Sequence, residues 1–508
     1  MQIRSSQLLI HKAKGDVKLG RSRLSSLSFC QCTMRSFYAF IGNGHGLEGK
    51  RPPIVALSEE DIYHHPAQAY EKVIKKYGPV VGVVRNNRLE YITDHSVTAH
   101  VLTADAMFSF EQASLQNLNL GFLLSLQQSL VKGLDVIVQE SITAKMEHIV
   151  DSLVPIFQHH IASLTESNSE RRESYSIPVD LESVARRMMA ESILTIIFGK
   201  KHTKPATIHA VEKVAVDITA ANGNRFQNLG YFSRNFPGLW LRLIWLKITI
   251  SSVPHYLRIS YIAFKEMGSR ESNDSESILD VFAKQCKARN GGCVPFLDKI
   301  WMIVVMFGLI FASVHQTAIL IVWVLFELAK QPQFLETFRK EVADQIDEDG
   351  DLCLNYAALK DARHLDSFIR EVMRTKGDTL LTARLTTADV PLAGYIIPKG
   401  SFVTPLATRS HMNEEYHGKN AKEFIGDRWV GMEKPAVMVS NSYFPWGLGR
   451  WACPGRFLAV AAVKMAVLYL ITNATPRLKD DKYRIRDPLN IILVPPEGQL
   501  LLYPIRKQ

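Results

Sequence analysis

One cysteine, Cys453, lies between a glycine-rich turn and a long apolar stretch. Gly447 and Gly449 allow a tight turn that can approach a flat partner closely, because glycine has no Cβ. Pro454 fits the first position of a helix over 457–471, where its missing N–H is not needed. At such a helix N-terminus, partial positive charge and backbone N–H groups favour the thiolate. We therefore expect a metal ligand or a nucleophile; the alternative is an ordinary glycine turn with a buried free cysteine.

Residues 444–456 resemble the cysteine loop of the cytochrome P450 family, the haem-thiolate monooxygenases. The residues that match are Gly447, Gly449, Cys453, Pro454, Gly455 and Arg456. The resemblance implies that Cys453 is the axial ligand of the iron in haem b, and that Gly447 and Gly449 let the loop lie against the haem. It covers the sequence from about Pro66 onward and is strongest in the last third.

Two positions of this loop depart from the family pattern. Trp446 stands where the family has phenylalanine, and as an apolar aromatic residue it is still expected to cover the sulfur beside the haem. Trp451 stands where the family has an arginine or histidine that meets a haem propionate. Because tryptophan carries no charge, that propionate must find its cation elsewhere. Arg384 matches another propionate-binding arginine of the family, although it could also be a solvated strand residue.

Glu371 and Arg374 are three residues apart and share one face of a helix predicted over 365–375. The spacing alone is weak, since Glu336 and Arg339 repeat it, and either pair could be a solvated surface pair. What distinguishes Glu371 is the order of the segments that follow it, which end at Arg428. The resemblance implies that Glu371, Arg374 and Arg428 form a buried ion cluster with a structural role under the haem loop.

Residues 300–326 contain no Lys, Arg, Asp or Glu and are long enough to span a bilayer. A transmembrane helix is therefore one interpretation. The polar residues of 313–317 lie at its middle, however, where contact with lipid would be costly. A long helix buried in a large helical core fits better.

This stretch resembles the family's oxygen-binding helix, in which an acid and a threonine recur. His315 stands in place of the acid and Gln316 in place of the threonine, with Thr317 one position late. On a helical period, Ala312, His315, Gln316 and Ile319 are expected to share a face. We predict that His315 relays protons and that Gln316 holds water, with Thr317 as a third catalytic candidate. The alternative for His315 is a histidine satisfied inside a packed helix.

The 508 residues show no internal repeat and no linker between domains. We expect a tail over 1–50 and a single domain over 51–508. Long helical patterns predominate from about residue 118 to 338, and short strands are expected at 80–85, at 88–93 and after Arg384. The resemblance implies a mainly α cytochrome P450 fold, with a large helical core around haem and a smaller β-rich region.

The charge and cysteine content exclude several other classes. Six cysteines without a C-x-x-C pair indicate neither a disulfide framework nor a zinc site, and a net charge of +10 makes no stripe for nucleic acid.

No flavin or nicotinamide domain is visible, so electrons would come from NADPH–cytochrome P450 reductase. Basic groups near Arg450, Arg456 and Lys464 would suit an acidic electron donor.

Two segments of the sequence bear on where the protein is located in the cell. Residues 1–50 are rich in basic residues and serine, which is typical of a mitochondrial transit peptide, a disordered tail or a misplaced gene start. The apolar, tryptophan-containing segment 236–264 carries Arg242, Lys247 and Arg258 and suits a helix that touches a membrane surface. A plain core helix pair is the alternative. We expect the endoplasmic reticulum surface, with the mitochondrion also possible.

Taken together, the residues predict a monooxygenase that inserts oxygen from O2 into a bulky apolar natural product, such as a terpenoid or polyketide, in fungal secondary metabolism. One alternative is a haem-thiolate isomerase or dehydratase that consumes no O2, because Gln316 replaces the usual threonine. The other is a non-enzymatic membrane protein built around 300–326.

Overall fold

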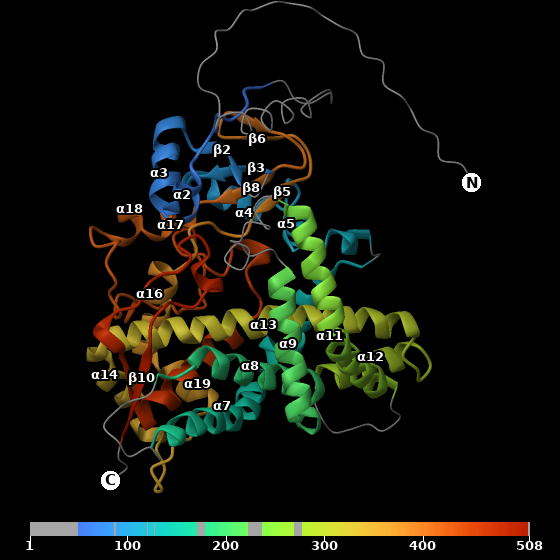
Figure 1. Cartoon of the computed structure of the whole chain (residues 1–508), viewed down its shortest axis with the longest axis vertical. Helices are drawn as coiled ribbons and strands as arrows, with labels where there is room; N and C mark the ends of the chain where they lie inside the picture. The colour runs from blue at the N-terminus through green and yellow to red at the C-terminus, as the bar shows by residue number, and fades with distance from the viewer. Residues whose placement is uncertain are drawn as a thin grey trace, which may run out of the picture. The chain divides into compact units, whose positions relative to one another are not determined.

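The apolar stretch at 300–326 lies within helix α13 (Phe296–Lys330), which packs against α8, α9 and α19 at the centre of the helical region (Figure 1). The computed structural model describes residues 49–85, 88–118, 120–125, 128–169, 178–221, 236–268 and 277–505. Residues 49–508 form one compact unit. The expected tail over 1–50 lies outside the described residues, except for its last two positions.

Helices make up most of the described chain, as the sequence predicts. Their bounds are α2 (Glu59–Tyr63), α3 (Pro66–Tyr77), α4 (His95–Thr103), α5 (Phe110–Asn117), α6 (Leu130–Ser141), α7 (Met146–Ser169), α8 (Leu181–Phe198), α9 (Pro205–Ala221), α11 (Pro237–Gly268), α12 (Ile278–Arg289), α13 (Phe296–Lys330), α14 (Leu335–Glu341), α15 (Tyr356–Asp361), α16 (Arg363–Thr375), α17 (Ala407–His411), α18 (Glu414–His417) and α19 (Arg456–Asn473).

Short polar residues begin several of these helices. Ser109 accepts a hydrogen bond from the Gln112 N–H at the start of α5, and Ser129 accepts one from the Lys132 N–H at the start of α6. Asp180 caps α8 in the same way. Each cap satisfies a backbone N–H that has no partner inside the helix.

A six-stranded sheet has the order β1-β2-β3-β8-β5-β4. Its bounds are β1 (Ile54–Val55), β2 (Val80–Arg85), β3 (Arg88–Thr93), β8 (Phe402–Pro405), β5 (Arg384–Thr386) and β4 (Phe108–Ser109). The hairpin β2–β3 has the predicted bounds, with Val80 opposite Thr93. β3 pairs in parallel with β8, which in turn places β5 and Arg384 inside the sheet.

Two smaller antiparallel pairs complete the β structure of the described residues. They are β6 (Val390–Leu392) with β7 (Tyr395–Ile397), and β9 (Ala474–Leu478) with β10 (Leu500–Pro504). Together with the six-stranded sheet they form the smaller β region of a mainly α fold, as predicted.

Within the described residues, α13 and the segment Gly449–Asn473 are long and apolar enough to cross a membrane. The most apolar stretch of α13 is nevertheless 78% buried inside the protein, and that of the second segment is 72% buried. Burial among other helices accounts for the apolar composition of both. The interpretation of 300–326 as a core helix is therefore favoured over a transmembrane helix.

Candidate active site

The loop before α19 turns tightly around two glycines. Gly447 has φ +82° and Gly449 has φ +68°, both in the left-handed region that glycine adopts without strain. A Cβ on Gly449 would lie 2.9 Å from Cγ2 of Thr103, and one on Gly447 would lie 3.1 Å from the Trp451 oxygen. The Cys453 N–H donates back across the turn to the Trp446 carbonyl at 2.7 Å. The loop therefore has no room for a side chain at either glycine.

The Cys453 side chain is accessible, although its surroundings are poor in water. Burial raises the pKa of the thiol, while the Gly455 and Arg456 N–H groups and the Arg456 guanidinium act in the opposite direction. The expectation that the loop alone favours the thiolate is therefore wrong, because burial outweighs the donors. A bound metal cation would remove the proton outright. We infer that the sulfur lies on the wall of an internal space, which suits a ligand for iron.

The centre of α13 has accessible positions one turn apart. Ala312 and Gln316 are exposed, whereas Val314, His315 and all residues from Thr317 to Leu328 are buried. Two exposed positions in the middle of a core helix must face a space within the helical region. Gln316 is thus free to hold a bound molecule, while the buried Thr317 is not.

His315 does not share these surroundings. Its side chain is 8% exposed, and its Nε2 lies 3.0 Å from the carbonyl oxygen of Leu493. Burial lowers the pKa of the ring, and the Leu493 contact only partly opposes this. The predicted common face is therefore wrong in part: Ala312 and Gln316 are accessible, but His315 and Ile319 are buried.

Arg384 is a buried guanidinium with an unmet hydrogen bond. It is 1% exposed, its Nη1 donates to the Thr382 carbonyl at 3.2 Å, and its Nε has no partner among the described residues. Burial lowers its pKa to about 10, which the charge of Asp105 partly opposes. A buried cation with a free N–H calls for an anionic acceptor, and a carboxylate such as a haem propionate fits.

Trp451 is held by packing instead of charge. Its ring stacks on Phe110 with centroids 5.7 Å apart and an angle of 28°. Arg384 also contacts Phe110, with its guanidinium carbon 4.8 Å from the ring centroid. The Arg450 guanidinium lies 5.1 Å from the Trp451 ring. Trp451 therefore continues a row of stacked groups that ends at the candidate propionate ligand.

The structure brings Glu371, Arg374 and Arg428 together in a buried cluster. Arg374 donates twice to the Glu371 carboxylate at 2.7 and 2.9 Å, and Arg428 Nε donates at 3.0 Å. Burial alone would raise the pKa of Glu371, but the hydrogen bonds from Arg374 and the charge of Arg428 hold it below its usual value. Glu336, in contrast, is an exposed residue paired with Arg339. The two E-x-x-R pairs thus have opposite environments.

Several residues that sequence reasoning missed connect this cluster to the cysteine loop. Trp429 Nε1 also donates to Glu371 at 3.0 Å. His411 offers its carbonyl to Arg374 at 2.7 Å, while its Nε2 accepts the Phe444 N–H at 3.2 Å. Phe444 begins the cysteine loop, so His411 joins the ion cluster to that loop.

A second support holds the loop from the other side. Arg370 donates to the Pro435 and Met438 carbonyls at 2.7 and 2.8 Å. Trp446 Nε1 donates to the Ala436 carbonyl in the same segment at 2.8 Å. The indole of Trp446 is therefore held against the segment 435–438, and its predicted cover of the sulfur stays a prediction.

The basic group expected near the cysteine loop is smaller than predicted. Lys464 is buried, where its ammonium group pairs with Asp366 at 2.8 Å and donates to the Leu359 carbonyl at 2.8 Å. Arg456 is half-buried and donates to the Cys453 carbonyl. Arg450 remains exposed. Lys464 is thus a core residue and cannot meet a partner protein.

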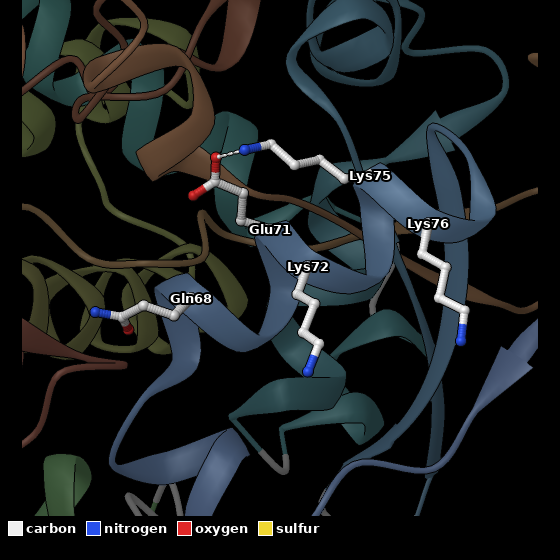
Figure 2. A pocket seen from close by; sticks show the side chains of 5 residues that line it. All are labelled: Gln68, Glu71, Lys72, Lys75 and Lys76. Atoms are coloured by element: carbon white, nitrogen blue, oxygen red, sulfur yellow. Dashed lines mark ion pairs between the residues drawn. The ribbon is translucent and has the colours of Figure 1, made fainter.

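A hollow on the surface of α3 is lined by Gln68, Glu71, Lys72, Lys75 and Lys76 (Figure 2). Glu71 and Lys75 form an ion pair at 2.8 Å on successive turns, and none of the predicted site residues lines the hollow. It is an ordinary charged helix face.

An accessible cysteine on a glycine loop, in a mainly helical fold with a buried guanidinium whose Nε has no partner among the described residues, is the arrangement of a haem-thiolate protein. The residues present fit the group: Cys453 for the iron, Arg384 for a propionate and Gly447 and Gly449 for close approach. The cytochrome P450 family profile matches residues 53–502. The chain belongs to the cytochrome P450 family, whose members hold haem through a cysteine thiolate.

Similar curated proteins are named cytochrome P450 monooxygenases or oxidases. One from Gibberella fujikuroi is 31% identical over 34% of this chain and 37% of its own length, and CYP512U6 from Ganoderma lucidum is 35% identical over 36% and 37%. The beta-amyrin 11-oxidase of Glycyrrhiza uralensis is 24% identical over 63% and 62%. Each match thus spans less than two thirds of the relative.

Proposed function

We propose that this protein is a monooxygenase that inserts one oxygen atom from O2 into a bulky apolar natural product, such as a terpenoid or polyketide, in fungal secondary metabolism. The observation that carries the proposal is the accessible Cys453 sulfur on a glycine loop at the start of α19. The names of the fungal relatives support the reaction, and the beta-amyrin 11-oxidase supports a large apolar substrate.

The chain contributes the ligands and the setting for this chemistry. When bound, haem supplies activation of dioxygen, with electron donation from a cysteine thiolate favouring O–O cleavage. Cys453 would bind the iron, and Trp446 would shield the sulfur from water. Arg384 would donate to a propionate through its Nε, which has no partner among the described residues. The cluster around Glu371 would hold the loop in place for the iron.

Gln316 is the residue that we assign to hold water on the distal side. Its amide can both donate and accept hydrogen bonds but does not exchange protons near neutral pH. It is accessible at the centre of α13, whereas Thr317, the candidate with a hydroxyl group, is buried. Protons therefore pass through water that the Gln316 amide orients.

We propose that NADPH–cytochrome P450 reductase delivers the electrons. Arg450 is exposed only three residues before Cys453, on the loop that carries the iron ligand. An acidic donor protein would be attracted to this position, which lies close to the electron acceptor. Arg450→Glu is expected to slow reduction by the reductase but not reduction by dithionite, and equal rates with the reductase would refute the contact.

We further propose that α11 rests on an anionic membrane surface. Large apolar side chains recur along it every three or four residues and are exposed; they are Leu239, Leu243, Leu246, Ile250, Val253, Leu257, Tyr261 and Phe264. Exposed Arg242, Lys247, Arg258 and Lys265 flank this stripe. An apolar stripe flanked by cations is typical of a helix that lies in a lipid interface. The endoplasmic reticulum is the membrane we assign, and the mitochondrion is the alternative.

Sedimentation with vesicles of phosphatidylserine and phosphatidylcholine tests the stripe. Ile250→Asp with Leu257→Asp is expected to abolish binding, while Met432→Asp, an exposed apolar position outside α11, keeps it. Equal binding of all variants would contradict the proposal. Loss of a dimer in the α11 variant without lipid would assign the stripe to a second copy of the chain.

Two measurements on the purified protein test the main proposal. The reduced protein with carbon monoxide is expected to show the strongly red-shifted band of thiolate-ligated haem. Oxygen uptake must then match product formation. A product formed without oxygen uptake would move the protein to the isomerase or dehydratase class.

A further inference from the structure

The turn 435–438 precedes the cysteine loop and belongs to no helix or strand, yet each of its backbone carbonyls accepts a hydrogen bond from a side chain. The donors are Arg370 Nη1, to Pro435 and Met438 at 2.7 and 2.8 Å, Trp446 Nε1, to Ala436 at 2.8 Å, and Arg456 Nε, to Val437 at 3.0 Å. Buried backbone groups must find partners, and here side chains supply them. The place of the turn is therefore coupled to the places of these three side chains.

Two of these donors also hold the backbone of Cys453. The Trp446 carbonyl accepts the Cys453 N–H at 2.7 Å, and Arg456 Nη1 donates to the Cys453 carbonyl at 2.8 Å. Both backbone polar groups of the candidate iron ligand are thus bound by residues whose side chains contact the turn 435–438. A displacement of the turn would therefore displace Cys453.

A buried ion pair fixes the remaining side of the turn. The Ala436 N–H donates to Asp366 Oδ2 at 2.7 Å, while Asp366 Oδ1 lies 2.8 Å from Lys464 Nζ. Lys464 is 4% exposed and also donates to the Leu359 and Ala362 carbonyls at the end of α15, at 2.8 and 3.2 Å. Because Asp366 lies in the first turn of α16 and Lys464 lies on α19, the pair connects the turn to three helices.

The ion pair supplies something that apolar packing would not. Replacing a buried ion pair by apolar residues of similar volume is often neutral or stabilising, because each charge loses its hydration on burial. An apolar side chain at position 366 could not, however, accept the N–H of Ala436, which is itself fully buried. That N–H would then have no partner, at a cost in free energy. The carboxylate therefore determines where Ala436 lies.

We propose that Asp366 and Lys464 are positioning residues for the iron ligand. Lys464 orients the Asp366 carboxylate, and the carboxylate holds the turn 435–438 through the Ala436 N–H. The turn holds the two donors that bind the Cys453 backbone. This inference rests on the proposed haem-thiolate function, in which Cys453 binds the iron.

Two uncharged double variants isolate this role, because they differ only in the acceptor for the Ala436 N–H. Asp366→Asn with Lys464→Met removes both charges but keeps a side-chain oxygen at position 366. Asp366→Leu with Lys464→Met keeps a branched side chain of similar shape but has no acceptor. Ser192→Ala, which removes a buried hydroxyl bonded within α8, is the control for loss of an ordinary buried hydrogen bond.

The measurements are backbone hydrogen exchange and the reduction potential of the iron, both on the haem-loaded protein. The amides of 436–438 are expected to exchange roughly tenfold faster in the Asp366→Leu double variant than in the Asp366→Asn one, which corresponds to about 1.4 kcal/mol for one buried hydrogen bond. A displaced Cys453 donates less electron density to the iron, so the potential is expected to become more positive. The Asp366→Asn double variant and Ser192→Ala should keep the exchange rates and the potential of the unaltered protein.

The outcomes distinguish this inference from the proposed function. Absence of the red-shifted carbon monoxide band in the unaltered protein would refute the haem-thiolate assignment itself. With that band present, equal exchange in the two double variants would overturn the positioning role alone. Different exchange with equal potentials would also overturn it, because the turn would then not act on Cys453. Equal loss of haem from both double variants would make the acceptor irrelevant and overturn the role, whereas loss from the Asp366→Leu double variant alone supports it.

Discussion

Replacing Glu371 by alanine tests whether the buried ion cluster holds the cysteine loop. The Glu371 carboxylate receives two hydrogen bonds from Arg374 and one each from Arg428, Trp429 and the Ile425 N–H, at 2.7–3.0 Å. Truncation leaves two guanidinium groups without their anion in an interior where Glu371 itself is 0% exposed. An uncompensated buried charge is among the most damaging changes that a fold can undergo.

The size of the effect follows from this geometry. Removing one partner of a buried ion pair typically lowers the free energy of unfolding by about 3–5 kcal/mol. Solvent screening does not reduce this figure, because Glu371 and Arg374 are both fully enclosed. Whole domains are stable by only about 5–15 kcal/mol. We therefore expect Glu371→Ala to yield little haem-loaded protein and Glu371→Gln, which keeps the volume and some hydrogen bonds, to lose less.

Glu336→Ala is the matched control, because it breaks the other E-x-x-R pair. The Glu336 side chain is 71% exposed, and loss of an exposed pair is expected to cost less than about 1 kcal/mol. The measurements are urea unfolding and haem content per protein. If the Glu371 and Glu336 variants lose the same stability, the buried cluster does not hold the loop and the reasoning fails.

Three other predictions concern the loop and its surroundings. Cys453→Ser is expected to lose the red-shifted carbon monoxide band, while Cys353→Ser, at an exposed cysteine elsewhere, keeps it. A band that is retained in Cys453→Ser would exclude Cys453 as the iron ligand. Gln316→Ala is expected to keep haem but to release hydrogen peroxide in place of product, and unchanged coupling of NADPH use to product would exclude its role in holding water. Burial, with the charges of His417, Arg374 and Arg370, lowers the pKa of His411 to about 3. The neutral ring therefore contributes its full stability above the pKa of the unfolded state, which is about 6.5. This contribution is lost as the pH falls from there toward 3. In His411→Gln, urea midpoints measured from pH 7 to 4 should fall less steeply than in the unaltered protein, and equal slopes would exclude His411 as the source.

Periodic segments of the fold were predictable from the sequence. The hairpin strands at 80–85 and 88–93 have the predicted bounds. The first is rich in valine, and the second contains Tyr91, Ile92 and Thr93, residue types that favour strands. The core helix predicted over 300–326 extends to 296–330, since its charged ends continue the helix beyond the apolar run. Only the buried part of a helix must be apolar. An apolar run therefore predicts which part of a helix is buried better than it predicts where the helix begins and ends.

Two residues whose predicted surroundings were wrong show that the spacing of residues along a helix does not decide which of them are buried. Lys464 was expected at the surface, but its ammonium group meets the carbonyls that end α15, together with Asp366. His315 was grouped with Gln316 by helical period, although the turn at 491–493 covers one and not the other. In both cases a segment distant in sequence determines the environment.

The residues that hold the cysteine loop in place could not be identified from the local sequence either. His411 and Phe444 are 33 positions apart and bond through a backbone N–H, which no side-chain pattern reveals. Arg370 acts on the Pro435 and Met438 carbonyls in the same way. A short helical spacing could identify Glu371 and Arg374, because both partners lie on one helix. Partners that meet only through the tertiary fold had to be found in the structure.

The departures at Trp451 and His315 share one physical consequence. Each places a group that is uncharged in its surroundings where the family pattern described above leads one to expect a charged one. Each makes a packing or backbone contact: Trp451 stacks on Phe110, and His315 binds Leu493. In the proposed haem binding, the propionate side would depend on Arg384, whose Nε has no hydrogen-bond partner among the described residues. Retention of haem would then rest more heavily on the bond from Cys453, and through it on the ion cluster that fixes the loop.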